Sequence, residues 1–150
     1  RQQDSRGQET VRLRTLRGVL SDTNIQQLVV DDGRLNHGLK VKEFHVWVQG
    51  AAAEGVYVVL GTQYDMNPGG DASDNRQIAW AGNAWGTSSP PVASSFSVVD
   101  PDHIVIQDLY IQRINPNDIA NYLIVLEPIT LNNDETILQL IKESSQDDTR

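Results

Sequence analysis

The sequence predicts an all-β fold, a single antiparallel sandwich of about eight strands. Short runs rich in Val, Ile and aromatic residues recur along the 150-residue chain, separated by clusters of Gly, Pro, Asn and Asp. No helical pattern separates one run from the next, which excludes an alternating βαβ architecture. Several connections are too long for tight hairpins, and this favours a jelly roll over an up-and-down barrel. An immunoglobulin-like sandwich is the alternative fold.

The first three runs differ in how their apolar residues alternate. Residues 10–14 alternate apolar side chains with arginines, as a half-buried strand does. Residues 25–30 form the second run, which ends at the turn sequence of residues 31–33. In the third run, residues 39–49, the apolar positions change from odd to even numbers near residues 42–43. This change predicts a β-bulge or a strand that crosses between sheets.

The fourth and fifth runs lie on either side of a long polar loop. Residues 55–63 are apolar at both odd and even positions, which is typical of a central strand. The loop covers residues 65–75, and residues 76–81 form the shorter fifth run. A stretch rich in Gly, Ser and Pro follows at residues 82–95, and its length predicts a long connection instead of a tight hairpin.

The last three runs complete the predicted strands. The sixth run, residues 96–99, stops at an Asp-Pro sequence. The seventh covers residues 103–114, and its apolar parity switches between Ile106 and Leu109. The eighth covers residues 120–131. Its proline indicates an edge strand or a strand end.

One helix is predicted, over residues 133–145. Asn132 and Glu135 have the spacing of a capping box at its start. An apolar stripe at helical spacing consists of Ile137, Leu138, Leu140 and Ile141. We expect this stripe to cap one open end of its own sandwich or to contact a neighbouring copy.

Charge divides the chain into an arm and a body. Five arginines against Asp4 and Glu9 give residues 1–18 a net charge of +3, which leaves −11 for the remainder of a chain whose total is −8. We therefore expect an N-terminal arm over residues 1–18 and one domain over residues 19–150. An acidic body argues against nucleic-acid binding by the domain itself. Arm residues expected to reach a neighbour or a genome are Arg6, Arg12, Arg14 and Arg17.

The residue inventory argues against catalysis and against a cofactor. The chain has no cysteine, which excludes a thiol nucleophile, a disulfide and a thiolate zinc site. It has no Gly-x-Ser-x-Gly elbow, no phosphate-binding glycine loop and no close His-x-His pair of the kind found in cupin metalloenzymes. No apolar stretch approaches the roughly 18–20 residues that cross a bilayer. We expect a protein that is not an enzyme.

Two groups of polar residues are weak candidates for a cation site. Asp100, Asp102 and His103 offer oxygen and nitrogen ligands, but Asp-Pro-Asp equally predicts a turn between strands. In the long polar loop the candidates for Ca²⁺ are Asp71, Asp74 and Asn75, without the spacing of an EF-hand. The interpretation we adopt is that no metal is bound.

Aromatic residues near the two long connections suggest a binding surface. Tyr64, Trp80 and Trp85 could stack on sugar rings, which is the hypothesis of a carbohydrate-binding module. Trp80 alternates with core positions, so we expect it to be buried. Trp85 has no strand pattern around it, which makes it the better candidate for a subunit contact.

Five segments of the chain resemble small jelly-roll virion structural proteins of marine viruses, of the bacteriophage-like kind. The segments are QIAW (77–80), FSVVDPDHIV (96–105), DLYI (108–111), NYLIVLEP (121–128) and LIKESSQDD (140–148), within a likeness that spans residues 15–148. The resemblance implies a capsid protein that assembles with copies of itself into an icosahedral shell in the virion. Its arm would lie inside the shell near the genome, and other virion proteins would be further partners. A decoration or minor capsid role is an alternative within the same resemblance.

Overall fold

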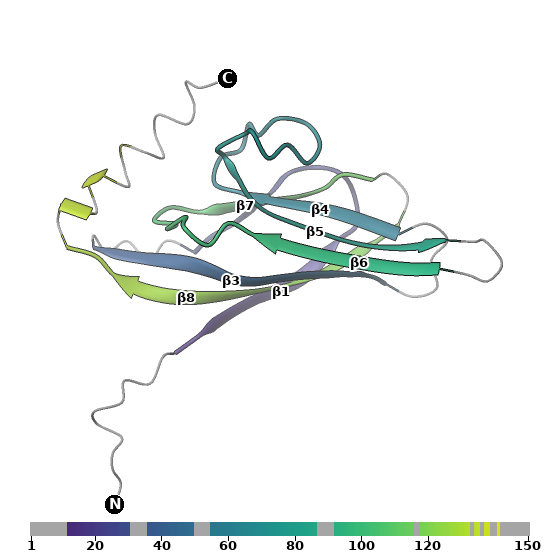
Figure 1. Ribbon diagram of the computed structural model, residues 1–150, viewed down its shortest axis with the longest axis horizontal. Helices are drawn as coiled ribbons and strands as arrows, with labels where there is room; N and C mark the ends of the chain where they lie inside the picture. Colours follow the sequence, from purple (N-terminus) through teal and green to yellow (C-terminus); the bar gives the residue numbers. More distant parts are fainter. Residues whose placement is uncertain are drawn as a thin grey trace, which may run out of the picture.

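The computed structural model describes residues 12–30, 36–49, 55–86, 92–115, 118–132, 134–135, 137–138 and 141. Eight β-strands make up this part of the chain (Figure 1). The strands are β1 (Arg14–Leu20), β2 (Gln26–Leu28), β3 (His37–Val48), β4 (Gly55–Gly61), β5 (Gln77–Gly86), β6 (Val92–Val99), β7 (Leu109–Arg113) and β8 (Ala120–Thr130).

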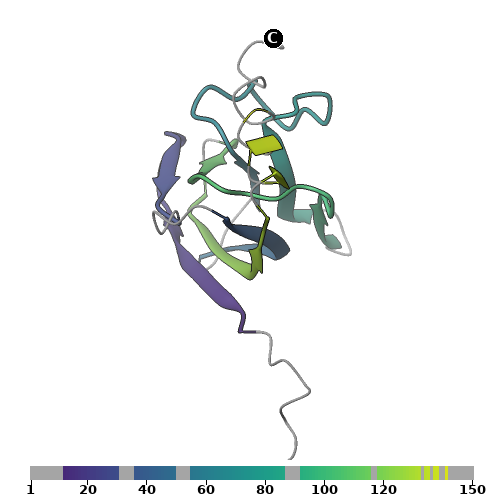
Figure 2. The same ribbon diagram turned by 90° about the vertical axis from the view of Figure 1, so that its left-hand side faces the viewer.

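The strands form two antiparallel sheets that face one another. The three-stranded sheet has the order β1-β8-β3, and the five-stranded sheet has the order β2-β7-β4-β5-β6. Seen from the end, the sheets form the two layers of a sandwich (Figure 2). The prediction of an all-β fold with antiparallel sheets is confirmed.

Both parity switches in the sequence correspond to irregular strand pairing. In β3 the register with β8 shifts between Val41 and Glu43, so the first switch is a β-bulge. At the second switch, Val105 forms an isolated bridge with Leu39 of β3, whereas β7 starts at Leu109 in the other sheet. The predicted strand over residues 103–114 is therefore wrong in extent, because the chain crosses from one sheet to the other within it.

Two other predicted boundaries need correction. The predicted first strand at residues 10–14 lies at 14–20 instead, because β1 pairs with β8 from Arg14 to Leu20. Residues 14–18 of the expected arm thus belong to the sheet, and residues 1–11 lie outside the described part of the chain. The long connection expected at residues 82–95 is largely a β5–β6 hairpin, paired as far as Gly86 and Val92.

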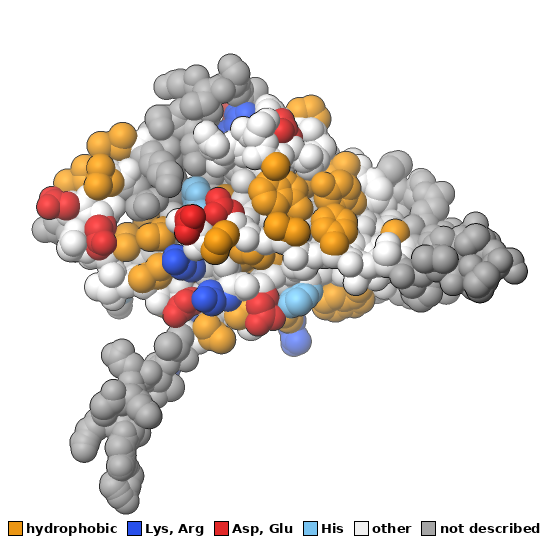
Figure 3. All heavy atoms as spheres, in the orientation of Figure 1, with side chains coloured by type: hydrophobic (Ala, Val, Ile, Leu, Met, Phe, Trp, Pro, Cys, Tyr) orange, Lys and Arg blue, Asp and Glu red, His pale blue; other side chains and the backbone are white. Residues whose placement is uncertain are grey.

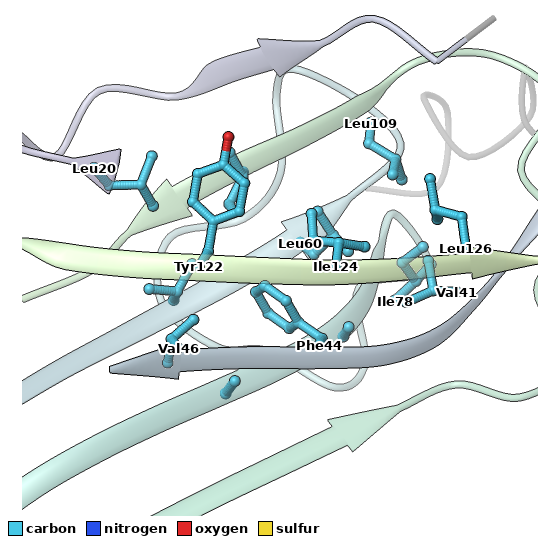
Figure 4. Close-up of a cluster of buried hydrophobic side chains, with 14 of the residues drawn as sticks. Leu20, Val41, Phe44, Val46, Leu60, Ile78, Leu109, Tyr122, Ile124 and Leu126 are labelled. Atoms are coloured by element: carbon cyan, nitrogen blue, oxygen red, sulfur yellow. The ribbon is translucent and has the colours of Figure 1, made fainter. Parts of the chain in front are cut away.

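The core fills the space between the two sheets. Alternation along each strand sends every second side chain inward, and Phe44, Leu60, Ile124 and Leu126 are completely buried there (Figure 4). Close packing of these side chains holds the sheets together, since burial of apolar surface is the main favourable term in folding.

Two polar side chains of the β7–β8 connection form hydrogen bonds with the backbone at the start of β4. Asp118 Oδ2 accepts a hydrogen bond from Gly55 N at 2.7 Å, and Asn115 Oδ1 accepts one from Tyr57 N at 2.8 Å. Asn115 Nδ2 also donates to Gly55 O at 2.7 Å. These bonds satisfy backbone groups that have no sheet partner, so the β7–β8 connection fixes where β4 begins.

The backbone is helical at the described residues 134, 135, 137, 138 and 141, and the rest of the predicted helix lies outside the described residues. Glu135 Oε1 accepts from Asn132 N at 3.0 Å and Asn132 Oδ1 accepts from Glu135 N at 2.7 Å, which is the reciprocal pair of a capping box. Ile137, Leu138 and Ile141 are 55%, 65% and 60% exposed, so these three do not cap their own sandwich as one expectation held. Within the described residues no helix is both long and apolar enough to cross a membrane.

The two phenylalanines of the chain provide a matched test of the core. Phe44→Ala removes a fully buried ring, whereas Phe96→Ala removes one that is 48% exposed. We expect Phe44→Ala to lower the free energy of unfolding by about 4 kcal/mol and Phe96→Ala by about 1 kcal/mol, measured by urea denaturation. Equal losses at the two positions would contradict the placement of Phe44 between the sheets.

Candidate functional site

The outer side of the five-stranded sheet carries an unusual concentration of aromatic residues. Core residues Val58 and Leu60 of β4 pair with core residues of β5, which leaves the alternate positions facing outward. We define the aromatic face by the five residues Tyr57, Tyr64, Trp80, Phe96 and Tyr110. They are five of the nine aromatic residues in the sequence. Hydrophobic side chains gather over β4, β5 and β6 in Figure 3.

A glycine brings two of these rings together. Gly82 of β5 pairs with Tyr57 on one side and with Phe96 on the other. The two rings meet edge to face, with centroids 5.5 Å apart and planes at 69°. A Cβ atom at Gly82 would lie 2.6 Å from Phe96 Cε1, so only glycine leaves room for this contact. Val98 adjoins this pair in the next row of the sheet, opposite Trp80, and is 55% exposed.

A second aromatic pair lies toward the other edge of the face. Tyr64, from the loop after β4, meets Tyr110 of β7 with ring centroids 6.3 Å apart and planes at 77°. Tyr64 is among the exposed side chains of the molecule. Both pairs are edge to face, which aromatic rings prefer over flat stacking. The aromatic face therefore presents ring edges and part of the ring surfaces instead of one flat platform.

The loop between β4 and β5 positions Trp80. Trp80 Nε1 donates to Gln77 Oε1 at 2.8 Å, and Gln77 Nε2 donates to the carbonyl oxygens of Asn67 and Gly69, at 3.0 Å each. Gly70 lies against Tyr57 and Trp80. The loop thus packs against one end of the aromatic face and supports it there. Trp80 is half-buried on the outer side, so the expectation that it belongs to the core is wrong.

A buried ion pair gives this loop its shape. Arg76 is 1% exposed, and its Nε donates to Asp74 Oδ1 at 2.7 Å. Arg76 Nη2 donates to Asn67 Oδ1 at 3.0 Å, and Nη1 lies 3.5 Å from Asp65 Oδ1. Burial alone would raise the pKa of Asp74, but hydrogen bonds from Arg76 and from the backbone N–H of Asn67, with the charge of Arg76, hold that pKa below its usual value.

The loop carboxylates are engaged in hydrogen bonds within the loop. Asp71 Oδ1 accepts from Ser73 Oγ at 2.6 Å and from Ser73 N at 3.0 Å, while Oδ2 accepts from Asn67 Nδ2 at 3.0 Å. The bonds from Ser73 and Asn67 lower the pKa of Asp71. Asn75 is exposed. The geometry is that of a self-contained loop, and the weak Ca²⁺ interpretation gains no support from it.

The second weak cation candidate also has the geometry of a turn. Asp100 Oδ1 accepts from Asp102 N at 3.0 Å, the hydrogen bond that an Asx-type turn makes. His103 is buried whereas Asp102 is exposed. Across the part of the chain that the structure describes, no group of three or more His, Cys, Asp or Glu side chains is placed to hold a metal ion.

The outer face of the three-stranded sheet is mostly charged, with one apolar patch. Lys42 pairs with Glu127 at 3.4 Å, and His45 Nε2 lies 2.9 Å from Glu43 Oε1. Farther along the same face, Trp47 and Val19 are both exposed, and they flank Asn121 in register. We call these two residues the Trp47 patch. Sequence reasoning missed it, although the position of Trp47 between two inward-facing valines was a usable signal.

The structure describes only some of the remaining residues that the sequence predicts as contacts. Arg12, Arg14 and Arg17 are exposed, the last two on β1. The backbone of Trp85 pairs with Ala93 in the β5–β6 hairpin, but its side chain lies outside the described part of the structure. Arg6 and Leu140 also lie outside it.

In comparisons with known proteins, no family model, curated protein or solved structure matches this chain. The geometry of the aromatic face offers apolar and aromatic contact area supported by a hydrogen-bonded loop, and such a surface is suited to binding another apolar surface.

The ion pair in the loop leads to a pH-dependent prediction. Asp74→Asn removes the buried carboxylate that lies nearest to Arg76 and leaves only the more distant, exposed Asp65, so we expect a loss of about 3 kcal/mol in the free energy of unfolding at pH 7. Because the folded-state pKa of Asp74 lies below the usual value of 3.8, its contribution is present above pH 3.8 and is lost as the pH falls through the folded pKa.

The difference between wild type and Asp74→Asn should therefore shrink as the pH falls below 3.8, as measured by denaturant titration at each pH. The matched control is Asp102→Asn, the same exchange at an exposed turn, which should change stability at pH 7 by less than about 0.5 kcal/mol. A difference that stays constant with pH would contradict the role given to the Asp74 carboxylate.

Proposed function

We propose that this protein is a virion structural protein that assembles with copies of itself into a capsid shell. The observation that carries the proposal is the presence of exposed large apolar side chains in three separate places of one small domain. These places are the aromatic face, the Trp47 patch and the helical residues Ile137, Leu138 and Ile141. A shell requires each subunit to contact neighbours in several directions.

The three apolar surfaces point in different directions. The aromatic face and the Trp47 patch lie on the outer sides of opposite sheets, and the helical residues lie at the end of the sandwich where β8 finishes (Figure 1). A small-molecule binding protein instead concentrates its apolar surface in one concave site. The arrangement supports lateral association through repeated contacts.

The strand order supports a jelly roll as the form of the sandwich. A jelly roll results when a long antiparallel hairpin, with strands paired 1-8, 2-7, 3-6 and 4-5, rolls into two sheets of order 1-8-3-6 and 2-7-4-5. Here the sheets contain the orders β1-β8-β3 and β2-β7-β4-β5. Five of the six strand pairings of that arrangement are thus present.

The sixth pairing is modified at β6. This strand forms its ladder with β5, yet it also reaches β3, since Ser97 Oγ donates to the carbonyl oxygen of Phe44. β6 therefore lies at the corner between the sheets, where a jelly roll would pair it with β3. The strand order and the contact of β6 with β3 support a jelly roll as part of the proposal.

Charge sets the conditions under which copies would associate. A net charge of −8 makes the copies repel each other at long range, and salt screens this repulsion. Apolar burial at the contacts must then outweigh the repulsion. Exposed arginines at positions 12, 14 and 17 are the described residues suited to contact an acidic neighbour or a genome. A decoration or minor capsid role is the alternative within the same proposal.

A carbohydrate-binding module is the candidate from another class. Tyr64 and Trp80 share the aromatic face, which favours it, but the edge-to-face pairing of Tyr64 with Tyr110 and of Tyr57 with Phe96 does not form a flat stacking platform. Self-association is therefore the function that the geometry supports better.

A lysine exchange on the aromatic face tests the proposal. Val98→Lys places a charge beside the aromatic rings of this face, whereas Val29→Lys makes the same change at a position outside the face that is 72% exposed. We expect wild type and Val29→Lys to form uniform closed particles in negative-stain microscopy, and Val98→Lys to remain in small species. Thermal unfolding should stay within about 3 °C of wild type for both variants, because both sites are exposed.

The proposal fails if the wild-type chain sediments as a monomer over a range of salt and protein concentrations. Binding of that monomer to a glycan array, with loss of binding in Trp80→Ala, would establish the carbohydrate-binding alternative instead. Equal assembly of Val98→Lys and wild type would remove the aromatic face from the contacts.

A further inference from the structure

A pocket lies at one end of the sandwich, near the start of β3 and the end of β8. We define the end pocket as the cavity of about 150 Å³ whose lining includes Arg14, Val30, Leu39, Val105, Ile106 and Pro128. It opens between the two sheets, next to the point where the chain crosses from one to the other at Val105. Among the described residues that line it, none is acidic.

The helical segment has the complementary properties. Ile137, Leu138 and Ile141 are exposed apolar side chains, and the preceding turn carries the exposed acids Asp134 and Glu135. A cavity of about 150 Å³ accommodates a group the size of benzene, which matches one aliphatic side chain of this stripe. Arg14, exposed where it lines the pocket, would face the acidic turn.

The chain leaves the sheet close to its own pocket but in a fixed direction. Thr130 pairs with His37, which also lines the pocket, and Leu131 N donates to Asn36 O at 2.7 Å. Leu131 is buried, and its Cδ1 lies 3.4 Å from where a Cβ of Gly38 would stand. The capping box then starts the helix at once after Asn132. These bonds fix where the segment leaves the two sheets (Figure 1). The side chains of Ile137, Leu138 and Ile141 are exposed there.

We infer that the helical segment of one copy docks in the end pocket of a second copy. The occupant is thus a defined part of this same chain, chosen because its apolar stripe fits the cavity, its acids complement Arg14, and its fixed exit keeps it out of its own pocket. This contact rests on the proposed function in that the partner is another copy. It uses a different surface from the aromatic face and can be tested separately.

Cross-linking tests the inference directly, since the natural chain has no cysteine. Asp134→Cys is made in one preparation and Gln107→Cys, at the exposed edge of the end pocket, in another that carries a tag. The two are mixed at full length and treated with a short bismaleimide. We expect a cross-linked heterodimer that the tag identifies by size. The matched control replaces Gln107→Cys with Ser21→Cys, at the opposite end of β1, and should give none.

Two further variants define the contact. Ile137→Lys with Leu138→Lys should abolish the cross-link between Asp134→Cys and Gln107→Cys while the thermal midpoint stays near that of wild type. Arg14→Glu should weaken association about two- to fivefold at low ionic strength, as expected for an exposed ion pair. Absence of the cross-link in the first mixture overturns the inference. So does a cross-link that forms only within one chain when both cysteines are placed in it.

The outcomes separate this inference from the proposed function. If Val98→Lys prevents closed particles but leaves the cross-link, the docking of the segment stands independently of shell formation. If wild type forms particles and the cross-link is absent, the proposed function stands and the docking fails. A cross-linked dimer without particles under any condition supports the docking and overturns the shell.

Discussion

The register between β4 and its neighbours is the constraint on which the rest of the structure depends. Val58 and Leu60 must face inward to complete the core with β5 and β7. Since successive side chains of a strand point to opposite faces, the same register fixes Tyr57 on the outside, and it aligns Trp80 and Gly82 beside it. A slip of one residue would turn Tyr57 into the core and expose Val58 and Leu60. Core burial therefore determines which surface is offered for contact.

A polar loop with its own buried ion pair supports that surface. Arg76 and Asp74 are both out of contact with water, and their mutual hydrogen bond compensates for the desolvation of each. Gln77 connects the loop to the sheet. Its Nε2 donates hydrogen bonds to two loop carbonyl oxygens, and its Oε1 accepts one from Trp80 Nε1. A rigid support lowers the entropy lost when a partner binds. The loop thus holds Trp80 in place on the aromatic face. The carboxylates of Asp71 and Asp74 are themselves engaged in hydrogen bonds within the loop.

Assembly through several weak surfaces agrees with the balance of charge and apolar area. The acidic copies repel one another, while each apolar surface contributes a modest attraction. Contacts in only one direction would end at a dimer, whereas contacts on both sheets and at the sandwich end extend the association. The end pocket and the helical segment add a contact that joins two copies through a defined chain end.

The sequence by itself determined the local features. Alternation predicted most strands, and the Asn132–Glu135 spacing predicted the capping box. The change of parity near residue 42 predicted either a β-bulge or a crossing between sheets, and the structure has the bulge. Each of these depends on residues close together in the chain, so the local pattern contains the information. The placement of Phe44 in the core follows in the same way from its alternation with polar neighbours.

Only the tertiary structure decided how the strands combine. The pairing of β1 with β8 and the passage from Val105 to β7 across the sandwich join residues far apart in sequence, and no local pattern specifies them. The same holds for the aromatic face, which gathers residues from four strands and from the loop, and for Trp80, whose side of the sheet depends on its partner strand. The Arg76–Asp74 pair is local in sequence, but its burial depends on how the loop folds back onto the sheet.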